Sequence, residues 1–287
     1  MAQYGTVYVD ERYSAIVAPN LYGQSTLQPK ITYNDAYQGD AASGLVKIPR
    51  IVRDGNGDPK PPASDFSHET AANVLLDLRL NNGFFKSKKI YGIAAASVNY
   101  KLAEAQLATS TQDARQDWQR SGLACLIKEG TADTDTSALT KANLKQRIVA
   151  ARAALRAKHA MPDVLTLSVG AFAAFLEFAG SEYTPDKNNE VATTGRSGSW
   201  LGFRVCEADL IDGAVNKYFD NAGVLQTVAM TKVDFVMYDH LAFAVVNHLE
   251  TIRIVDAVDF VGSYAQVNIN SGYRVNNADM VLVHQHA

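Results

Sequence analysis

The stretch from Gly44 to Lys128 most constrains what this chain can fold into. An extended segment, 44–52 (GLVKIPRIV), leads into a tip rich in Gly and Pro at 53–65, and a second extended segment returns at 74–80 (VLLDLRL). After 84–92 (FFKSKKIYG) a helical pattern runs on to about residue 128. In a monomer, a hairpin this long that feeds a solitary long helix leaves sheet edges and one helix face with nothing to bury against. The sequence therefore predicts a part that neighbouring chains complete.

The helical pattern itself spans Ser97 to Lys128. Its apolar or small side chains recur at spacings of four, three, four and seven residues, and charged residues occupy the other faces. The recurring residues are Leu107, Thr111, Ala114, Trp118 and Cys125. About 30 residues at a rise of 1.5 Å make a helix of roughly 45 Å. We expect it to form a spine, with Trp118 buried beneath a sheet.

Composition excludes several classes of protein. At 287 residues, with 47% hydrophobic and 20% charged content, the chain is a typical globular one. Its net charge of −3 gives no basic field of the kind that coats nucleic acid. Cys125 and Cys206 lie in apolar surroundings, which predicts reduced structural thiols. No signal peptide and no membrane-length apolar run is present, so we expect a cytosolic protein with no membrane partner.

The N-terminal segment 1–39 is unusual in its tyrosines. It holds Tyr4, Tyr8, Tyr13, Tyr22, Tyr33 and Tyr37 with little periodicity. Such a segment is neither a typical disordered tail nor a domain of its own, so we interpret it as an extended arm that lies on a partner surface. The alternative is an N-terminal strand of the chain's own domain.

After a polar linker at 129–137 a second, mixed α/β architecture is predicted. Thr140 is expected to cap a helix with an apolar face of Leu144, Ile148, Ala151 and Leu155. A buried strand at 163–168 leads to an apolar helix that Ser168 caps and Gly180 ends. The remaining segments are predicted as a strand at 200–210, strands at 233–239, 241–247 and 251–256, and a hairpin at 263–285 that turns at Asn270, Ser271 and Gly272.

Two loops resemble ligand-binding motifs without matching them. The hairpin tip, from Asp54 to Asp65, begins like a calcium loop, but Pro59 replaces the required Gly and Asp65 the bidentate Glu. We therefore interpret it as a hairpin tip. The run from Gly195 to Gly198 lacks the lysine of a phosphate loop and is interpreted as a plain loop.

Ser168 and the C-terminal histidines are the remaining candidates for chemistry. Strand, serine and helix resemble a nucleophile elbow, but Thr166 stands where a small residue is needed, and capping explains Ser168 more simply. His284 and His286 share one face of a strand and would bind a metal only with further ligands. We interpret that strand as an exposed C-terminal one. The sequence thus predicts no catalytic, cofactor or metal residues.

Helix 140–159 carries six basic residues and no acid: Lys141, Lys145, Arg147, Arg152, Arg156 and Lys158. Like charges on one helix cost a few tenths of a kcal/mol per neighbouring pair, and a partner of opposite charge would offset this cost. An acidic neighbouring subunit, nucleic acid and the acids of the 129–137 linker remain open, beside a solvated face.

The order of these parts resembles a family. An arm, the GLVKIPRI strand, a return strand, a spine helix, DVLTLSVGAFAAFLEFAG followed by WLGFRVCEADL, and AFAVVNHLETIRIVDA near the end look like the major capsid proteins of tailed double-stranded DNA bacteriophages. The resemblance covers nearly the whole chain and rests on segment order and spacing.

The resemblance implies an α+β fold of the Hong Kong ninety-seven type. Its parts would be an N-terminal arm at 1–39, an extended loop at 40–90, a peripheral domain with the spine helix at 91–138 and 252–278, and an α/β axial domain at 139–251 and 279–287. Some relatives join subunits by lysine–asparagine isopeptide bonds. Residues of the right type here are Lys47, Lys60, Asn268, Asn270, Asn276 and Asn277, and nothing marks a pair among them.

The resemblance also implies a function. The protein would be no enzyme but a structural subunit that assembles with copies of itself into pentamers and hexamers of an icosahedral head around double-stranded DNA, without sequence-specific contact. It would reside in the virion capsid after assembly in the host cytoplasm. Portal, scaffold or decoration proteins would be further partners, and no fused scaffolding domain is expected. Alternatives are an encapsulin-like compartment shell, a serine hydrolase centred on Ser168, and a DNA-binding module using helix 140–159.

Overall fold

The computed structural model describes residues 26–37, 44–51, 73–97, 101–179, 184–185, 197–208 and 215–287. The hairpin tip with its calcium-like loop, Lys60, and most of the predicted arm lie outside these residues. The chain divides into two compact units. Unit 1 comprises 1–22, 84–117 and 249–269, and unit 2 comprises 23–83, 118–248 and 270–287.

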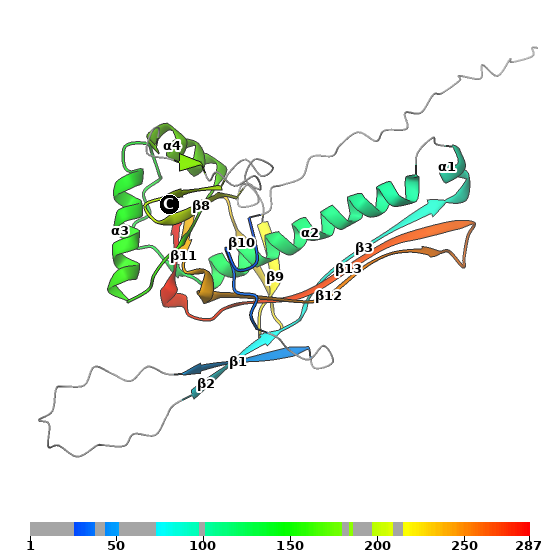
Figure 1. The fold of residues 1–287 in the computed structure, drawn as a ribbon, viewed down its shortest axis with the longest axis horizontal. Helices are drawn as coiled ribbons and strands as arrows, with labels where there is room; N and C mark the ends of the chain where they lie inside the picture. Colours follow the sequence, from blue (N-terminus) through cyan, green and yellow to red (C-terminus); the bar gives the residue numbers. More distant parts are fainter. Residues whose placement is uncertain are drawn as a thin grey trace, which may run out of the picture. The chain divides into compact units, whose positions relative to one another are not determined.

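The described residues form helices and strands in alternating runs (Figure 1). The helices are α1 (Gly92–Ser97), α2 (Leu102–Glu129), α3 (Leu144–Ala157) and α4 (Val169–Ala179), with the short helices η3 (His240–Ala242) and η4 (Ala278–Met280). The strands are β1 (Leu45–Ile51), β2 (Asn73–Arg79), β3 (Asn82–Tyr91), β4 (Thr131–Ala132), β5 (Val164–Leu167), β6 (Thr184–Pro185), β7 (Ser197–Trp200), β8 (Phe203–Glu207), β9 (Val215–Phe219), β10 (Leu225–Ala229), β11 (Val233–Tyr238), β12 (Phe243–Asp256), β13 (Gly262–Val275) and β14 (Val281–Gln285).

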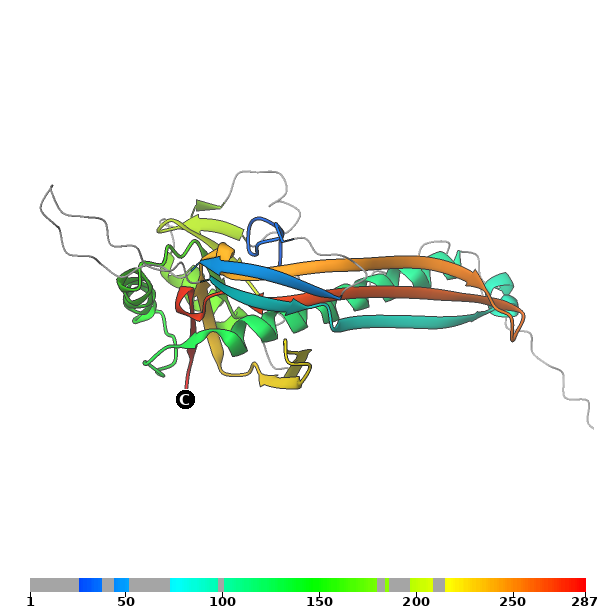
Figure 2. The same ribbon diagram turned by 90° about the horizontal axis from the view of Figure 1, so that it is seen from below.

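Unit 1 is built on a three-stranded sheet in the order β12-β13-β3, and Figure 2 shows the three long strands side by side. The predicted spine is confirmed as α2, although it begins at Leu102 rather than Ser97. Within the unit, Lys86 of β3 forms an ion pair of 2.5 Å with Asp117 of α2. Alternate residues of β13, such as Ala265 and Val267, are buried. The strand therefore has one packed face and one freer face.

The predicted hairpin at 263–285 is wrong. Residues 262–275 form one unbroken strand, β13, and the turn lies before it, where the Ala257 amide donates to the Gly262 carbonyl over 2.9 Å. Gly272 serves close packing instead of a turn, because a Cβ there would lie 2.5 Å from the Arg79 carbonyl oxygen. A glycine inside a strand pattern can mark a turn or the close approach of another backbone, and the sequence alone does not distinguish the two.

Unit 2 holds a seven-stranded sheet in the order β4-β14-β11-β5-β8-β7-β6. The predicted strand at 163–168 and helix after Ser168 are confirmed as β5 and α4. One core cluster joins α3 and α4 to alternate residues of β5, β8 and β11, so both helices cover the same face. The buried residues of α3 are the predicted Leu144, Ile148, Ala151 and Leu155.

Two local predictions in unit 2 are wrong. The N-cap of α3 is Asn143, not Thr140, because residues 141–143 form a turn before the helix. The segment 200–210 is not one strand but part of a hairpin between β7 and β8. Leu201 and Gly202 have φ angles of 52° and 82°. Positive φ at both positions of a two-residue loop is the geometry that suits a tight hairpin.

The base of the long hairpin is confirmed as an antiparallel pair, β1 and β2, in which Leu45 pairs with Arg79 and Ile51 with Asn73. One of its faces is buried: Val46, Ile48 and Leu78 form a cluster with Ala244 and Val246 of β12. This cluster anchors the hairpin in unit 2. Nothing pairs with its outer edges among the described residues.

The described part of the predicted arm, 26–37, packs on the chain's own unit 2. Leu27, Thr32 and Tyr33 are buried, and the Asn34 amide donates to the Phe243 carbonyl over 2.8 Å. These residues thus pack against the chain's own domain, although they form isolated bridges and not the strand of the alternative interpretation. Residues 1–25 lie outside the described part.

Trp118 is less buried than we expected. Its indole Nε1 donates to Asn247 Oδ1 over 2.8 Å, and its ring meets Tyr33 edge to face at 6.3 Å. The side chain is partly exposed, so it does not fill the core position that the spacing predicted.

None of the helices in the described part of the chain is long and apolar enough to cross a bilayer.

Candidate functional site

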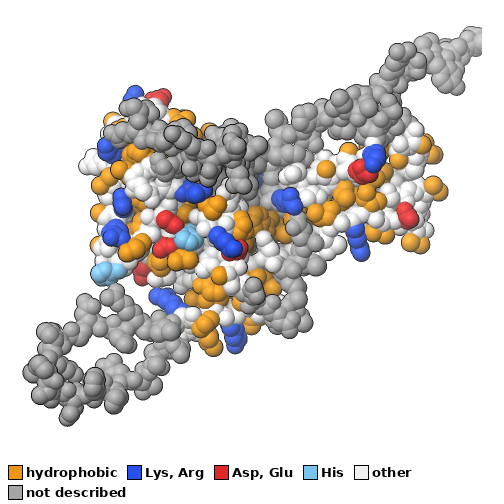
Figure 3. All heavy atoms as spheres, viewed as in Figure 1, with side chains coloured by type: hydrophobic (Ala, Val, Ile, Leu, Met, Phe, Trp, Pro, Cys, Tyr) orange, Lys and Arg blue, Asp and Glu red, His pale blue; other side chains and the backbone are white. Residues whose placement is uncertain are grey.

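Exposed apolar side chains gather where β3 meets α1 and where β12 turns into β13. Tyr91, Ile93, Val258 and Val261 form this apolar tip of unit 1, and Val258 is 102% and Val261 86% exposed. The Gly92 amide donates to the Val261 carbonyl over 2.9 Å, which holds the two segments together. Figure 3 shows hydrophobic side chains at the surface over this end of unit 1, on the right of the view. Exposed apolar clusters of this kind mark interaction surfaces.

Polar contacts hold the apolar tip in one shape. The Tyr264 hydroxyl donates to Asp259 over 2.5 Å, and Lys89 pairs with the same carboxylate at 3.4 Å. The Lys89 ammonium also lies over the rings of Phe260 and Tyr264, at 5.5 and 5.7 Å. The Tyr264 hydrogen bond, followed by Lys89, lowers the pKa of the Asp259 carboxyl. The turn is therefore ordered by surface contacts, since its valines bury almost nothing.

A groove of about 420 Å³ runs over the freer face of the unit 1 sheet. Phe85, Arg253, Gln266 and Asn268 line it, and Arg253 Nε donates to Gln266 Oε1 over 3.0 Å. The Asn268 Oδ1 atom is buried and has no hydrogen-bond partner among the described residues. A donor from outside unit 1 would satisfy it.

Unit 2 carries further exposed apolar positions on its two hairpins. Val74 and Leu75 of β2 are 46% and 58% exposed. Phe219, Val224 and Leu225 are similarly exposed on the β9–β10 pair. These hairpins are two-stranded among the described residues, and such pairs are marginal in water unless something covers them.

Among the described residues, the lysine and the asparagines considered for a crosslink lie on different elements. Lys47 is exposed on β1, and Asn268 and Asn270 lie on β13. Asn276 donates to the Tyr37 hydroxyl over 3.3 Å, and Asn277 accepts from the Asp279 amide over 3.3 Å as the cap of η4. The last two asparagines thus have structural roles, and the crosslink stays a prediction.

Ser168 acts as the predicted helix cap. Its side chain is buried, and its Oγ accepts from the Ala171 amide over 3.3 Å at the start of α4. The geometry given for this hydroxyl is that of a cap, and nothing observed favours a nucleophile. The Ser197–Gly198 end of the predicted loop at Gly195 belongs to strand β7, and residues 195–196 lie outside the described part.

The interpretation of an exposed C-terminal strand is wrong. β14 lies inside the seven-stranded sheet between β4 and β11, and His284 is fully buried. Its ring stacks on Phe235 at a centroid distance of 4.9 Å. His286 follows the strand and contacts Asp234 at 3.1 Å. Chain-terminal position suggested exposure, but the partner strands come from distant sequence.

The cysteines are buried free thiols, as predicted. Burial raises the pKa of the Cys206 thiol to about 11, and it raises the pKa of Cys125 as well. Both therefore stay protonated and unreactive at neutral pH.

Several basic residues in and beside α3 find partners within unit 2. Arg147 pairs with Asp135 of the linker, and Lys158 with Asp279 at 2.8 Å. The Arg152 guanidinium lies 5.2 Å from the Phe203 ring and donates to the Leu201 carbonyl. An acid of the linker thus neutralises part of the positive charge of this helix, which was one of the alternatives that the sequence left open. These partners weaken the case for a nucleic-acid site on the helix.

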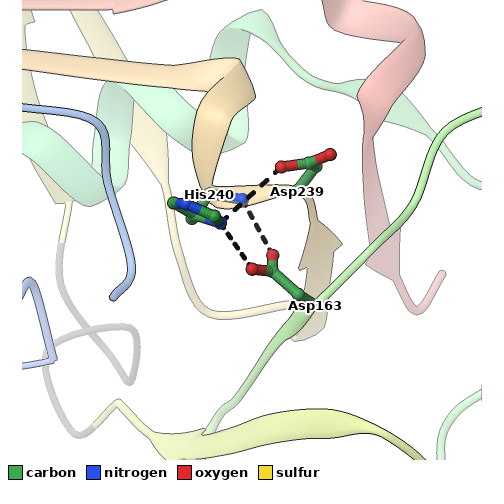
Figure 4. Close-up of side chains that lie close together, drawn as sticks. All are labelled: Asp163, Asp239 and His240. Atoms are coloured by element: carbon green, nitrogen blue, oxygen red, sulfur yellow. Dashed lines mark hydrogen bonds and ion pairs between the residues drawn. The ribbon is translucent and has the colours of Figure 1, made fainter. Parts of the chain in front are cut away.

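The sequence did not predict the cluster of Asp163, Asp239 and His240. One carboxylate oxygen or ring nitrogen of each, atoms that could bind a metal ion, lie within 4.8 Å of one another (Figure 4). His240 Nδ1 lies 2.5 Å from Asp163 Oδ2, and the His240 amide donates to Asp163 Oδ1 over 2.9 Å. Asp239 caps η3 by accepting from the Leu241 amide, and burial raises the pKa of its carboxyl. The atoms satisfy one another, so the cluster fastens the corner where β11 ends beside β5. The cluster depends on the pairing of β5 with β11, which places Asp163 beside Asp239 and His240. Only a prediction of that pairing could have revealed the cluster.

Comparisons with known proteins place the fold. No protein-family model matches the sequence, and no curated protein matches it. A solved structure from Mycobacterium phage Che8 is 20% identical with a TM-score of 0.71, covering 98% of this chain and 98% of that chain. The capsid structure of the Cyanophage P-SCSP1u is 10% identical with a TM-score of 0.67, over 100% and 95% of the two chains. The capsid of Ralstonia phage GP4 is 9% identical with a TM-score of 0.64, over 100% and 98%.

At these identities the likeness concerns the fold, and it extends over nearly the whole of each chain. The protein has the α+β phage major-capsid fold that its sequence resembles. The fold prediction is therefore confirmed, including the spine helix and the base of the long hairpin.

Proposed function

We propose that this protein is a structural major capsid protein, which assembles with copies of itself into pentamers and hexamers of an icosahedral virus head enclosing double-stranded DNA. The observation that carries the proposal is the likeness to capsid structures over nearly all of both chains. The exposed apolar tip of unit 1 and the open edges of the β1–β2 hairpin support it, because neighbouring subunits would cover both.

The same proposal assigns roles to parts of the chain. Residues 1–39 and 40–90 would reach onto neighbours as arm and extended loop, although 26–37 also pack on the chain's own unit 2. Residues 91–138 with 252–278 would form the peripheral domain, and 139–251 with 279–287 the axial domain. The function is mechanical, with no catalytic step, and the protein resides in the virion after assembly in the host cytoplasm. Portal, scaffold or decoration proteins are further partners of such a shell.

Sedimentation velocity of the purified protein at micromolar concentration, followed by negative-stain microscopy, tests the proposal. We expect closed particles or their capsomers, far heavier than one chain, since specific interfaces of this kind bury well over about 1,000 Å² each. A required scaffold protein should be present in the sample. A sole monomer peak under these conditions would contradict the proposal.

A matched pair of variants makes the test specific to the apolar tip. Val258→Asp adds a charge to the tip, and Gln112→Glu adds one to an exposed position of α2 in the same unit. Both should leave the free energy of unfolding of the subunit within about 0.5 kcal/mol of wild type. Only Val258→Asp should reduce particle yield, by tenfold or more. Equal yields would show that the tip is no assembly surface.

The contents of the particles distinguish this proposal from a compartment shell. Particles made in the infected host should hold double-stranded DNA. Particles that hold an enzyme in its place would support a shell while overturning the virus-head assignment.

A further inference from the structure

A fully buried histidine lies in the seven-stranded sheet of unit 2, outside the surfaces described above. The His284 side chain, on β14, has no exposed area. Its Nδ1 lies 2.9 Å from Asp133 Oδ2, and its Nε2 lies 3.0 Å from the Ser137 carbonyl oxygen. The Phe235 ring stacks on one face, with an interplanar angle of 7°. The imidazole thus bridges the strand and the segment 131–137 that follows α2.

Both of these partners are acceptors. A carbonyl oxygen has no proton to give, and an ionised carboxylate has none either. A neutral imidazole has one N–H and one bare lone pair, so one ring nitrogen would face an oxygen lone pair inside the core. Such a contact is costly where water cannot replace it. The geometry fits a ring that donates from both nitrogens, which only the imidazolium does.

The charges around the ring favour the same form. Asp234 Oδ2, on β11, lies 3.6 Å from His284 Nε2 and has no hydrogen-bond partner among the described residues. The other oxygen of that carboxylate contacts His286 Nδ1 at 3.1 Å. The ionisable groups that face His284 are therefore Asp133 from the linker and Asp234 from β11, with His286 behind the latter. Two carboxylates near one buried ring stabilise a positive charge on it.

We propose that His284 and Asp133 form a buried proton-binding site, in which the His284 imidazolium fastens residues 131–137 to the sheet and its deprotonation at higher pH loosens them. The fastened state holds one more proton than the loosened state. The equilibrium constant for loosening therefore rises with pH, by up to about tenfold per pH unit, over the range in which the loosened segment has lost the proton and the fastened site still holds it. The site works in the single subunit and does not depend on shell formation.

The variant Asp133→Asn removes the need for this proton while keeping the hydrogen bonds around it. Asp133 Oδ1 accepts from the Asp135 amide over 3.3 Å, and an asparagine Oδ1 would keep that bond. Its Nδ2 would then face His284 Nδ1 and donate to it. A neutral ring could accept there and donate from Nε2 to the Ser137 carbonyl, so every atom is satisfied without the extra proton. The variant should fold and lose the pH dependence.

Hydrogen exchange of the full-length subunit between about pH 6 and 9 tests the site, since histidine titrates in that range. The reporters are the Asp133 amide, bonded to the Val283 carbonyl, and the Ala287 amide, bonded to the Thr136 carbonyl. After correction for intrinsic exchange, wild-type protection of the two amides should fall with rising pH, by up to about tenfold per pH unit where the two states differ by one proton. Protection should be nearly flat in Asp133→Asn, while His286→Gln keeps the wild-type slope.

A flat profile in wild type, or the same slope in Asp133→Asn, would overturn the proposal. Nitrogen NMR of histidine-labelled protein provides a readout that needs no variant. At about pH 6 the His284 ring should show protons on both nitrogens, and a ring with one N–H there would overturn the proposal too.

Discussion

The helix-covered sheet of unit 2 and the apolar tip of unit 1 are both ordered, but by different forces. In unit 2, Leu144, Ile148 and Phe175 are each 0% exposed and fix the elements by burial. In the tip, Val258 and Val261 are almost fully exposed, and an ion pair, a hydrogen bond and an edge-to-face ring pair fix the turn. The difference distinguishes residues that stabilise the fold by burial from residues that stay exposed and available for contacts with other molecules.

The largest effect should follow from truncating the core of unit 2. Phe175→Ala removes a fully buried ring that packs edge to face on Trp200 at 5.1 Å. Such truncations typically cost about 3 to 5 kcal/mol. We expect loss of soluble protein, or a lower thermal transition measured by circular dichroism. Val258→Ala in the tip is the control and should stay within about 0.5 kcal/mol of wild type. Equal losses in the two variants would break the comparison.

The sequence predicted best where burial within one segment decides the structure. β5, α4 and the face of α3 follow local periodicity, and the structure confirms them. The predictions from sequence failed where segments distant in the chain decide the local structure. Gly272 sits in a strand because β2 passes close by, and His284 is buried because β4 and β11 flank its strand. Period-two patterning and a glycine do not reveal such partners.

Among the candidate surfaces, the hairpin could be predicted from the sequence and the apolar tip could not. The base of the hairpin follows from alternation in 44–52 and 74–80. The tip depends on the side chain of Lys89 meeting Asp259, 170 positions later, and no local pattern reports that contact. Trp118 was placed in the core by spacing alone, yet its indole needed a polar partner, Asn247, and stayed partly exposed.

A pH-dependent effect is expected from Glu129, at the end of α2. Burial raises the pKa of this carboxyl, although the Val275 amide and Arg274 oppose the shift. A raised folded-state pKa favours folding below the usual value of 4.5, and this contribution is lost as the pH rises through the raised value. Glu129→Gln keeps an acceptor for the Val275 amide and removes the charge. Its midpoint in urea should therefore fall less between pH 4.5 and neutrality than that of wild type, and parallel curves would contradict the assignment.

A smaller effect is expected from Ser168→Ala, which removes the cap of α4. Loss of a serine cap costs about 1 kcal/mol. The variant should fold, with a slightly lower urea midpoint, and should assemble into particles at wild-type yield. A serine-reactive phosphonate should label neither protein. Labelling of wild type alone, with no particles from either protein, would replace the capsid proposal with a hydrolase.

The smallest change in stability should come from Tyr264→Phe, which tests whether order in the tip matters without burial. The variant keeps the ring that lies against Lys89 and Phe260 but loses the hydroxyl that donates to Asp259. An exposed substitution of this kind stays within about 0.5 kcal/mol. Tyr37→Phe, which removes a hydroxyl from unit 2, is the matched control.

Because the hydroxyl orders the turn and burial does not, Tyr264→Phe should speed hydrogen exchange at residues 257–261 and slow assembly measured by light scattering. Tyr37→Phe should change neither quantity. If Tyr264→Phe loosened the turn and assembly kept its rate, the tip would not need to be preorganised for its contacts. If the turn itself stayed protected, burial by some other contact would order it, and the contrast between the two regions would fail.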